Sequence, residues 1–84
     1  MSAPRPGAAG AARSRHLRKR SFSLAGHRTS VALEPEFWDA LEHAAAARGV
    51  PLSRLVASTD AERTDPEQPL ASALRVLALR LAAA

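Results

Sequence analysis

The residue types of several catalytic sites occur in this chain of 84 residues, but their spacing does not assemble them. Serine, histidine and aspartate are all present, yet nothing places a hydroxyl beside a base that is oriented by an acid. The histidines His16, His27 and His43 are too far apart to have metal-ligand spacing. The absence of cysteine excludes disulfides and thiolate metal sites. We therefore expect no catalytic residue, no metal and no cofactor, and predict that the protein is not an enzyme.

The charged residues divide the chain into a basic arm and a mildly acidic body. Residues 1–20 contain six cations and no acid, whereas residues 21–84 contain six arginines and eight acids. A basic arm of this kind indicates contact with a polyanion, most commonly nucleic acid. Because the arm is rich in Ala, Gly, Pro and Arg, we expect residues 1–20 to be disordered when free. A targeting presequence and a solvated tail without a partner are the other interpretations.

One segment has the alternation of a half-buried strand. The predicted outer face carries Arg28, Ser30 and Ala32, and the predicted inner face carries Thr29, Val31 and Leu33. A shorter alternation over residues 21–24 stops at Ala25 and Gly26. A hairpin between the two is conceivable, but its first strand would be only three or four residues long.

Three helices are predicted after this strand, over residues 35 to 48, about 51 to 62 and about 70 to 82. The first begins with proline in its first turn and ends with Arg48 before Gly49, both typical of helix ends. The third has leucines at positions 70, 74, 77 and 81, and we expect this seam either to dock on the body or to contact a partner. The predicted core or dimer-interface residues are Val31, Leu33, Phe37, Trp38, Leu41 and Leu55.

The body needs a partner to complete both its sheet and its core. In the whole chain 20 of the 39 hydrophobic residues are alanine, so large apolar side chains are scarce. A strand without a long mate also exposes unpaired backbone groups, which pairing with a second copy would satisfy. We therefore predict a mostly α chain with one short β-strand, which forms an intermolecular two-stranded antiparallel ribbon in a homodimer.

Four segments of the body carry a family resemblance: KRSFSLAGHRTSVALE at 19–34, PEFWDAL at 35–41, ARGVPLS at 47–53 and LASALRV at 70–76. With them, residues 19–81 resemble the ribbon-helix-helix family, the Arc/MetJ-like repressors, and more closely a bacterial subfamily of short ribbon-helix-helix proteins. The resemblance implies an intertwined dimer whose paired strands enter the DNA major groove, which a two-stranded ribbon fits.

The resemblance also implies roles for individual residues. Outward residues of the strand would read base edges: Arg28 could fork onto guanine, Ser30 could bond several bases, and Ala32 could touch only a thymine methyl. Backbone N–H groups at the start of the second helix would hold phosphate. Pro51 has no N–H, so this clamp would rest on Leu52 and Ser53. Lys19 and Arg20 flank the ribbon and would contact phosphates.

We therefore expect a sequence-specific DNA-binding transcription regulator of the bacterial cytoplasm, associated with the nucleoid. No stretch approaches the roughly 18 consecutive apolar residues of a membrane span, so no membrane partner is expected. Two alternatives stay open. One is an antitoxin-like or adaptor module that holds a partner protein through the helix at 70–82, and the other is a non-specific nucleic-acid binder that acts through its basic tail.

Overall fold

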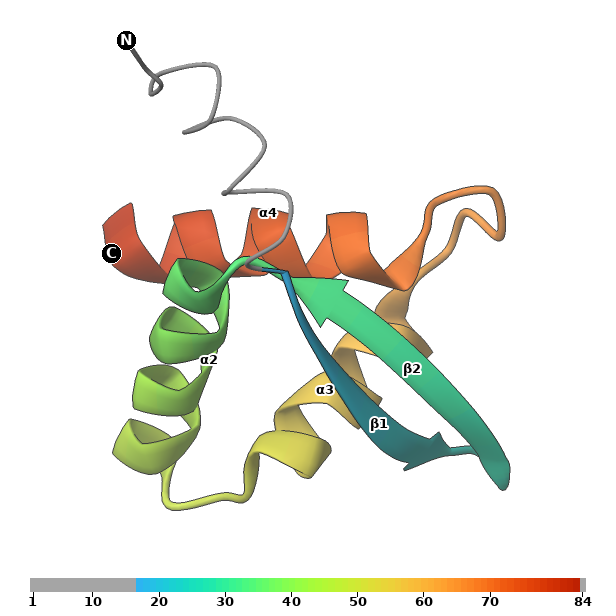
Figure 1. The fold of residues 1–84 in the computed structure, drawn as a ribbon, viewed down its shortest axis with the longest axis horizontal. Coiled ribbons are helices and arrows are strands. Elements are labelled where there is room, and N and C mark those ends of the chain that lie inside the picture. The colour runs from blue at the N-terminus through green and yellow to red at the C-terminus, as the bar shows by residue number, and fades with distance from the viewer. Residues whose placement is uncertain (1–16, 84) are drawn as a thin grey trace, which may run out of the picture.

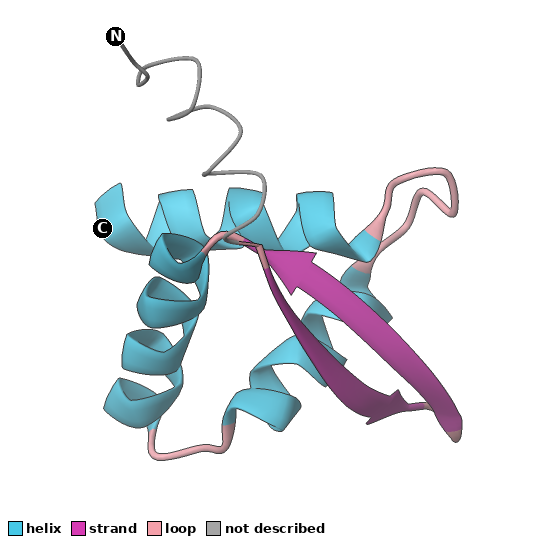
Figure 2. Cartoon of the chain, viewed as in Figure 1, coloured by secondary structure: helices cyan, strands magenta, loops and turns pink. Residues whose placement is uncertain are grey.

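The computed structural model describes residues 17–83, which form a two-stranded hairpin followed by three helices. The elements in chain order are β1 (Arg18–Leu24), β2 (His27–Leu33), α2 (Pro35–Arg48), α3 (Leu52–Glu62) and α4 (Leu70–Ala83). In Figure 1, α4 runs along one edge of the molecule, while α2 and α3 descend from it and meet at their connecting turn. Figure 2 shows the hairpin as the sole sheet of the described residues. The mostly helical fold class is therefore confirmed.

The structure corrects the expected number of strands. β2 pairs antiparallel with β1 of the same chain, over seven residues each, from Arg18 opposite Leu33 to Leu24 opposite His27. The expected strand is therefore one half of an intrachain hairpin, and a second copy is not what pairs with β2 along this edge. The sequence hides the length of β1 because arginines 18 and 20 occupy its inner-face positions, where alternation would predict apolar residues.

A tight two-residue turn joins the strands. Ala25 and Gly26 have φ values of 52° and 84°, the pair of positive angles that a type I′ hairpin turn requires. Alanine is an uncommon residue at such a position, because its Cβ crowds the backbone in the left-handed region. The turn nevertheless sets the register, since Leu24 and His27 face each other directly across it.

The position of β1 also moves the expected domain boundary. The predicted arm ended at residue 20, but Arg18, Lys19 and Arg20 are the first three residues of β1. The folded part therefore includes half of the six cations that the sequence assigned to the arm. The remaining cations of the arm, and the expectation of disorder there, lie outside the described residues.

The helices have the ends that their sequences predict. α2 covers 35–48 as expected, with proline at its start and Gly49 at φ 68° after its end. The N–H groups of Gly49 and Val50 donate to the carbonyls of Ala46 and Ala45, each at 3.0 Å, and so satisfy the last turn. α3 begins at Leu52, one residue after the predicted start, and α4 extends to Ala83.

The core lies between the inner face of the hairpin and the three helices. Five of the six residues predicted for the core are buried, namely Val31, Leu33, Trp38, Leu41 and Leu55, while Phe37 is half-buried against them. Phe22 and Leu24 of β1 join this cluster. Leu74 of α4 has no exposed surface, because α4 packs against α2, α3 and β2 of its own chain. The leucine seam therefore docks on the body.

Candidate nucleic-acid interface

The outward face of the hairpin is a small polar surface that no helix covers. Its residues are Lys19, Ser21 and Ser23 of β1, and Arg28, Ser30 and Ala32 of β2. Five of these side chains are exposed, and Ala32 is half-buried. The alternation of each strand directs the intervening residues to the opposite side of the sheet. The outward face itself carries only small or cationic side chains.

The register arranges this surface as three cross-strand pairs. Lys19 lies opposite Ala32, Ser21 opposite Ser30, and Ser23 opposite Arg28. The two cations therefore lie near opposite ends of the hairpin, with Ser21 and Ser30 between them. No acidic residue belongs to this face, so nothing on it opposes the approach of a polyanion.

The middle pair of the face is joined by a side-chain hydrogen bond. The hydroxyl oxygens of Ser21 and Ser30 lie 3.0 Å apart, and either hydroxyl can be the donor. Directly opposite residues of an antiparallel pair have Cβ atoms about 4.5–5.5 Å apart, close enough for this contact. The bond therefore links the polar groups of β1 and β2 into one unit on an exposed surface.

Arg20, the other predicted phosphate contact on β1, lies on the opposite face of the strand. Its Nη1 donates to Oε2 of Glu42 at 2.6 Å, and its guanidinium lies 5.0 Å from the centroid of the Trp38 ring. Both partners belong to α2, so Arg20 joins the hairpin to a helix. The structure brings together Lys19, Arg28, Ser30 and Ala32, but it does not bring Arg20 to that surface.

Trp38 fixes the start of β1 through two further contacts. Its indole Nε1 donates to the backbone oxygen of Arg18 at 2.8 Å, and its ring lies 5.9 Å from that of Phe22, centroid to centroid. The residue is 2% exposed, as expected for a core position. Because β1 supplies half of the outward face, Trp38 positions that face from behind.

A similar arginine joins α4 to the start of α2. The Arg75 guanidinium lies 5.8 Å from the Phe37 ring centroid, and its Nε and Nη2 each lie 3.0 Å from Oε1 of Glu34. Phe37 and Trp38 are neighbours in α2, so cations from two different elements stack on consecutive aromatic residues. Neither arginine contact was predicted from the sequence.

The predicted phosphate clamp lies at the first turn of α3 and not on the hairpin. The N–H groups of Arg54 and Leu55 donate to the carbonyl of Pro51 at 3.0 and 3.4 Å, so those of Leu52 and Ser53 precede the first bonds of the helix. Such groups have no partner within a helix and can bind an anion. Leu52 is half-buried and Ser53 is exposed.

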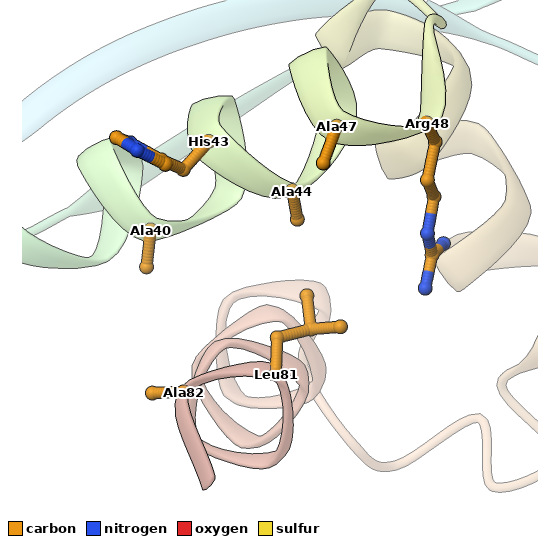
Figure 3. A pocket seen from close by; sticks show the side chains of 7 residues that line it. All are labelled: Ala40, His43, Ala44, Ala47, Arg48, Leu81 and Ala82. Atoms are coloured by element: carbon orange, nitrogen blue, oxygen red, sulfur yellow. The ribbon is translucent and has the colours of Figure 1, made fainter. Parts of the chain in front are cut away.

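An apolar groove lies between α2 and the end of α4. It has a volume of about 460 Å³ and is lined by Ala40, His43, Ala44, Ala47, Arg48, Leu81 and Ala82. Figure 3 shows the alanine methyl groups of α2 directed toward α4, and the side chain of Leu81 directed from α4 toward α2. A lining with one imidazole and one guanidinium contains no nucleophile paired with a base. The lining of this groove therefore offers no side-chain nucleophile for a covalent hydrolytic mechanism.

Residues 17–83 contain neither a candidate metal cluster nor a membrane-spanning helix. No cluster of three or more histidine and acidic residues within this range could hold a metal ion. None of its helices is both long and apolar enough to cross a membrane.

Ser21 and Ser23 were not predicted from the sequence as members of the outward face of the hairpin. The signal was present, because both residues stand at polar positions of the alternation over residues 21–24. Extending this alternation back to Lys19 and pairing it across the Ala25–Gly26 turn would have placed all three beside Arg28 and Ser30.

Comparison with known proteins agrees with this architecture. A family model described as a ribbon-helix-helix domain matches residues 17–82, which is nearly the whole described part of the chain. Searches of curated proteins and of solved structures found no match. Ribbon-helix-helix domains are typically DNA-binding transcription regulators or antitoxins, usually dimerise, and are generally non-enzymatic. With a family match of this extent and a hairpin followed by helices, the chain belongs to the ribbon-helix-helix family.

Proposed function

We propose that this protein is a bacterial transcription regulator that binds specific DNA sequences with the outward face of the β1–β2 hairpin. The observation that carries this proposal is the composition of that face, where two cations and three serines are exposed and no acid is present. A two-stranded ribbon fits the major groove, which is about 12 Å wide. Such a regulator would act in the cytoplasm, on the DNA of the nucleoid.

Each residue of the face has a role that suits its chemistry. Arg28 can donate two hydrogen bonds to O6 and N7 of guanine, and Ala32 can contact the methyl group of thymine. Ser30 can donate to or accept from a base edge, and Lys19, on the adjacent strand, suits a phosphate. At the start of α3, Leu52 and Ser53 would add backbone contacts to phosphate. Arg20 has no role here, because Glu42 and Trp38 hold it on the other face.

We also propose that the protein acts as a homodimer. One edge of β2 pairs with β1, and the other edge of β2 has no strand partner among the described residues. An unpaired edge is a template for a second copy, as the usual dimerisation of the family suggests. Light scattering should give twice the monomer mass of 8.9 kDa. A stable monomer at concentrations at which DNA binding saturates would exclude the dimer.

The test of the proposed function is a selection of binding sites from random-sequence duplexes with the full-length protein. The wild type should enrich one motif, and Arg28→Ala should lose at least part of it. Arg48→Ala is the matched control, because it removes an exposed arginine from the end of α2, away from the hairpin face. Equal enrichment by all three proteins would contradict the proposal.

The tail-driven alternative predicts a different result from the same experiment. If the basic tail alone binds nucleic acid, replacing Arg5, Arg13 and Arg15 by glutamine should abolish DNA binding, while Arg28→Ala should change little. The hairpin proposal predicts that the glutamine variant binds more weakly, yet still enriches the wild-type motif. Phosphate contacts made by the tail would add affinity without adding sequence information.

The partner-protein alternative is favoured by one observation on α4. Val76 and Leu79 are 42% and 63% exposed, although the helix buries its other face in the core. An antitoxin-like or adaptor module could use these two residues to hold a partner. Replacing both by aspartate should then release a co-purified partner while leaving DNA binding intact. Leu74 is unsuitable for this test because it is fully buried.

A further inference from the structure

The hydrogen bond between Ser21 and Ser30 fixes what the two hydroxyl groups can offer to a ligand. One hydroxyl gives its hydrogen to the other across the 3.0 Å contact. The donating oxygen keeps its lone pairs for an incoming donor, and the accepting hydroxyl keeps its hydrogen for an incoming acceptor. The exposed pair therefore presents one donor and one acceptor side by side.

We propose that Ser21 and Ser30 act as one recognition unit that reads adenine in the major groove. Adenine presents the N7 acceptor beside the N6 amino donor, the complement of what the serine pair offers. Guanine presents two acceptors there, and cytosine and thymine offer one donor and one acceptor, respectively. Only adenine therefore satisfies both hydroxyl groups with a single base. This inference rests on the proposed function, and it adds a specificity residue from β1.

A lone serine would discriminate poorly among the four bases, because its hydroxyl rotates and can either donate or accept a hydrogen bond. The bond across the hairpin uses one of the two hydroxyl hydrogens, so whichever serine donates, the pair keeps one donor and one acceptor for a base. Both serines are exposed; of their neighbours on this face Ser23 and Ala32 are small, and Lys19 and Arg28 are exposed cations. The same combination of one donor and one acceptor is what allows a single Asn or Gln amide to read adenine.

The position of Arg28 extends this inference to a second base. Arg28 is two residues from Ser30 along β2. At about 3.3–3.4 Å per residue, the separation is roughly 7 Å. Successive bases on one strand are about 3.4 Å apart, so this separation corresponds to roughly two base steps. A ribbon lying along the groove should therefore contact a guanine through Arg28 about two steps from the adenine.

The test compares variants of the full-length protein on four duplexes. These duplexes carry the motif enriched by the wild type and differ only at the base pair assigned to Ser21. The wild type should prefer adenine there, and Ser21→Ala should reduce that preference at least about fivefold, the loss of one bidentate contact. Ser21→Thr keeps the hydroxyl and should retain the preference. Ser72→Ala on α4 is the matched control and should resemble the wild type.

The outcomes separate this inference from the proposed function. If Ser21→Ala is folded by circular dichroism and discriminates among the four bases as the wild type does, the serine pair is not the reader. A wild-type motif without an adenine that responds to Ser21 would also overturn the inference. Both results leave the hairpin as the DNA-binding surface. Failure of the wild type to enrich any motif would instead overturn the proposed function.

Discussion

Lys19 and Arg20, neighbours in the sequence, lie on opposite faces of β1. The Arg20 guanidinium lies 5.0 Å from the Trp38 ring centroid and bonds to Glu42 on the helical side. Lys19 is exposed on the outward side, opposite Ala32. Two adjacent cations that look equivalent in the sequence should therefore contribute to different properties, one to the stability of the fold and the other to the binding of DNA.

Arg20→Ala should lower the free energy of unfolding by about 1 kcal/mol. A cation–π contact at an exposed site contributes about 0.5–1 kcal/mol, and an exposed ion pair contributes about 0–1 kcal/mol. We expect about 1 kcal/mol in total and not more, because the Arg20 and Glu42 side chains are 41% and 51% exposed and solvent screens their interaction. Urea denaturation measures the change. A variant as stable as the wild type would show that this arginine does not hold β1 to α2.

Lys19→Ala should leave stability almost unchanged and weaken DNA binding. If Lys19 neutralises one phosphate, removing it should reduce the slope of log K against log salt concentration by about 0.9. Fluorescence anisotropy over a range of salt concentrations gives this slope. Arg20→Ala is the control, and its slope should match that of the wild type. A reversed pattern, with the slope changed by Arg20→Ala alone, would contradict the assignment of faces.

Ala25→Asn should stabilise the hairpin. Ala25 has φ 52°, where an alanine costs on the order of 1 kcal/mol and asparagine is better tolerated. Gly26→Ala is the opposite change at φ 84°, and it should be destabilising even though a Cβ there would meet no atom within 4 Å. Thermal melting of both variants measures the change in melting temperature that each substitution causes. Destabilisation by Ala25→Asn would show that the turn is not of this type.

Leu74→Ala should destabilise the protein by about 2–5 kcal/mol, the usual cost of truncating a buried leucine. Leu79→Ala is the matched control on the same helix, where 63% exposure predicts a change within about 0.5 kcal/mol. This contrast tests which face of α4 is buried in the core. Similar effects of both substitutions would show that the buried face of α4 differs from the one described.

The sequence was sufficient to predict the helices, and it was less informative about the sheet. The helix ends carry local signals in their own residues, such as Pro35 and Gly49, and the predicted ranges match the structure to within one or two residues. The hairpin has no such signal, because Ala25–Gly26 is not one of the favoured turn pairs of a type I′ hairpin. The pairing of β1 with β2 could therefore be identified only from the structure.

The candidate site was predictable to the extent that alternation reveals a face. Arg28, Ser30 and Ala32 were assigned to one side of β2, and their side chains do lie there. The place of Arg20 was not predictable, because its Trp38 and Glu42 partners are distant in the sequence. The Ser21–Ser30 bond likewise depends on a register that only the closed hairpin defines.

The most direct test of the proposed DNA interface is an NMR titration of the full-length protein with the enriched duplex. The account predicts that the largest backbone amide shifts fall on the outward residues of the hairpin, Lys19, Ser21, Ser23, Arg28 and Ser30, with further shifts at the start of α3. Residues of the groove between α2 and α4 should change little. Shifts confined to the N-terminal tail or to α4, with the hairpin unaffected, would contradict it.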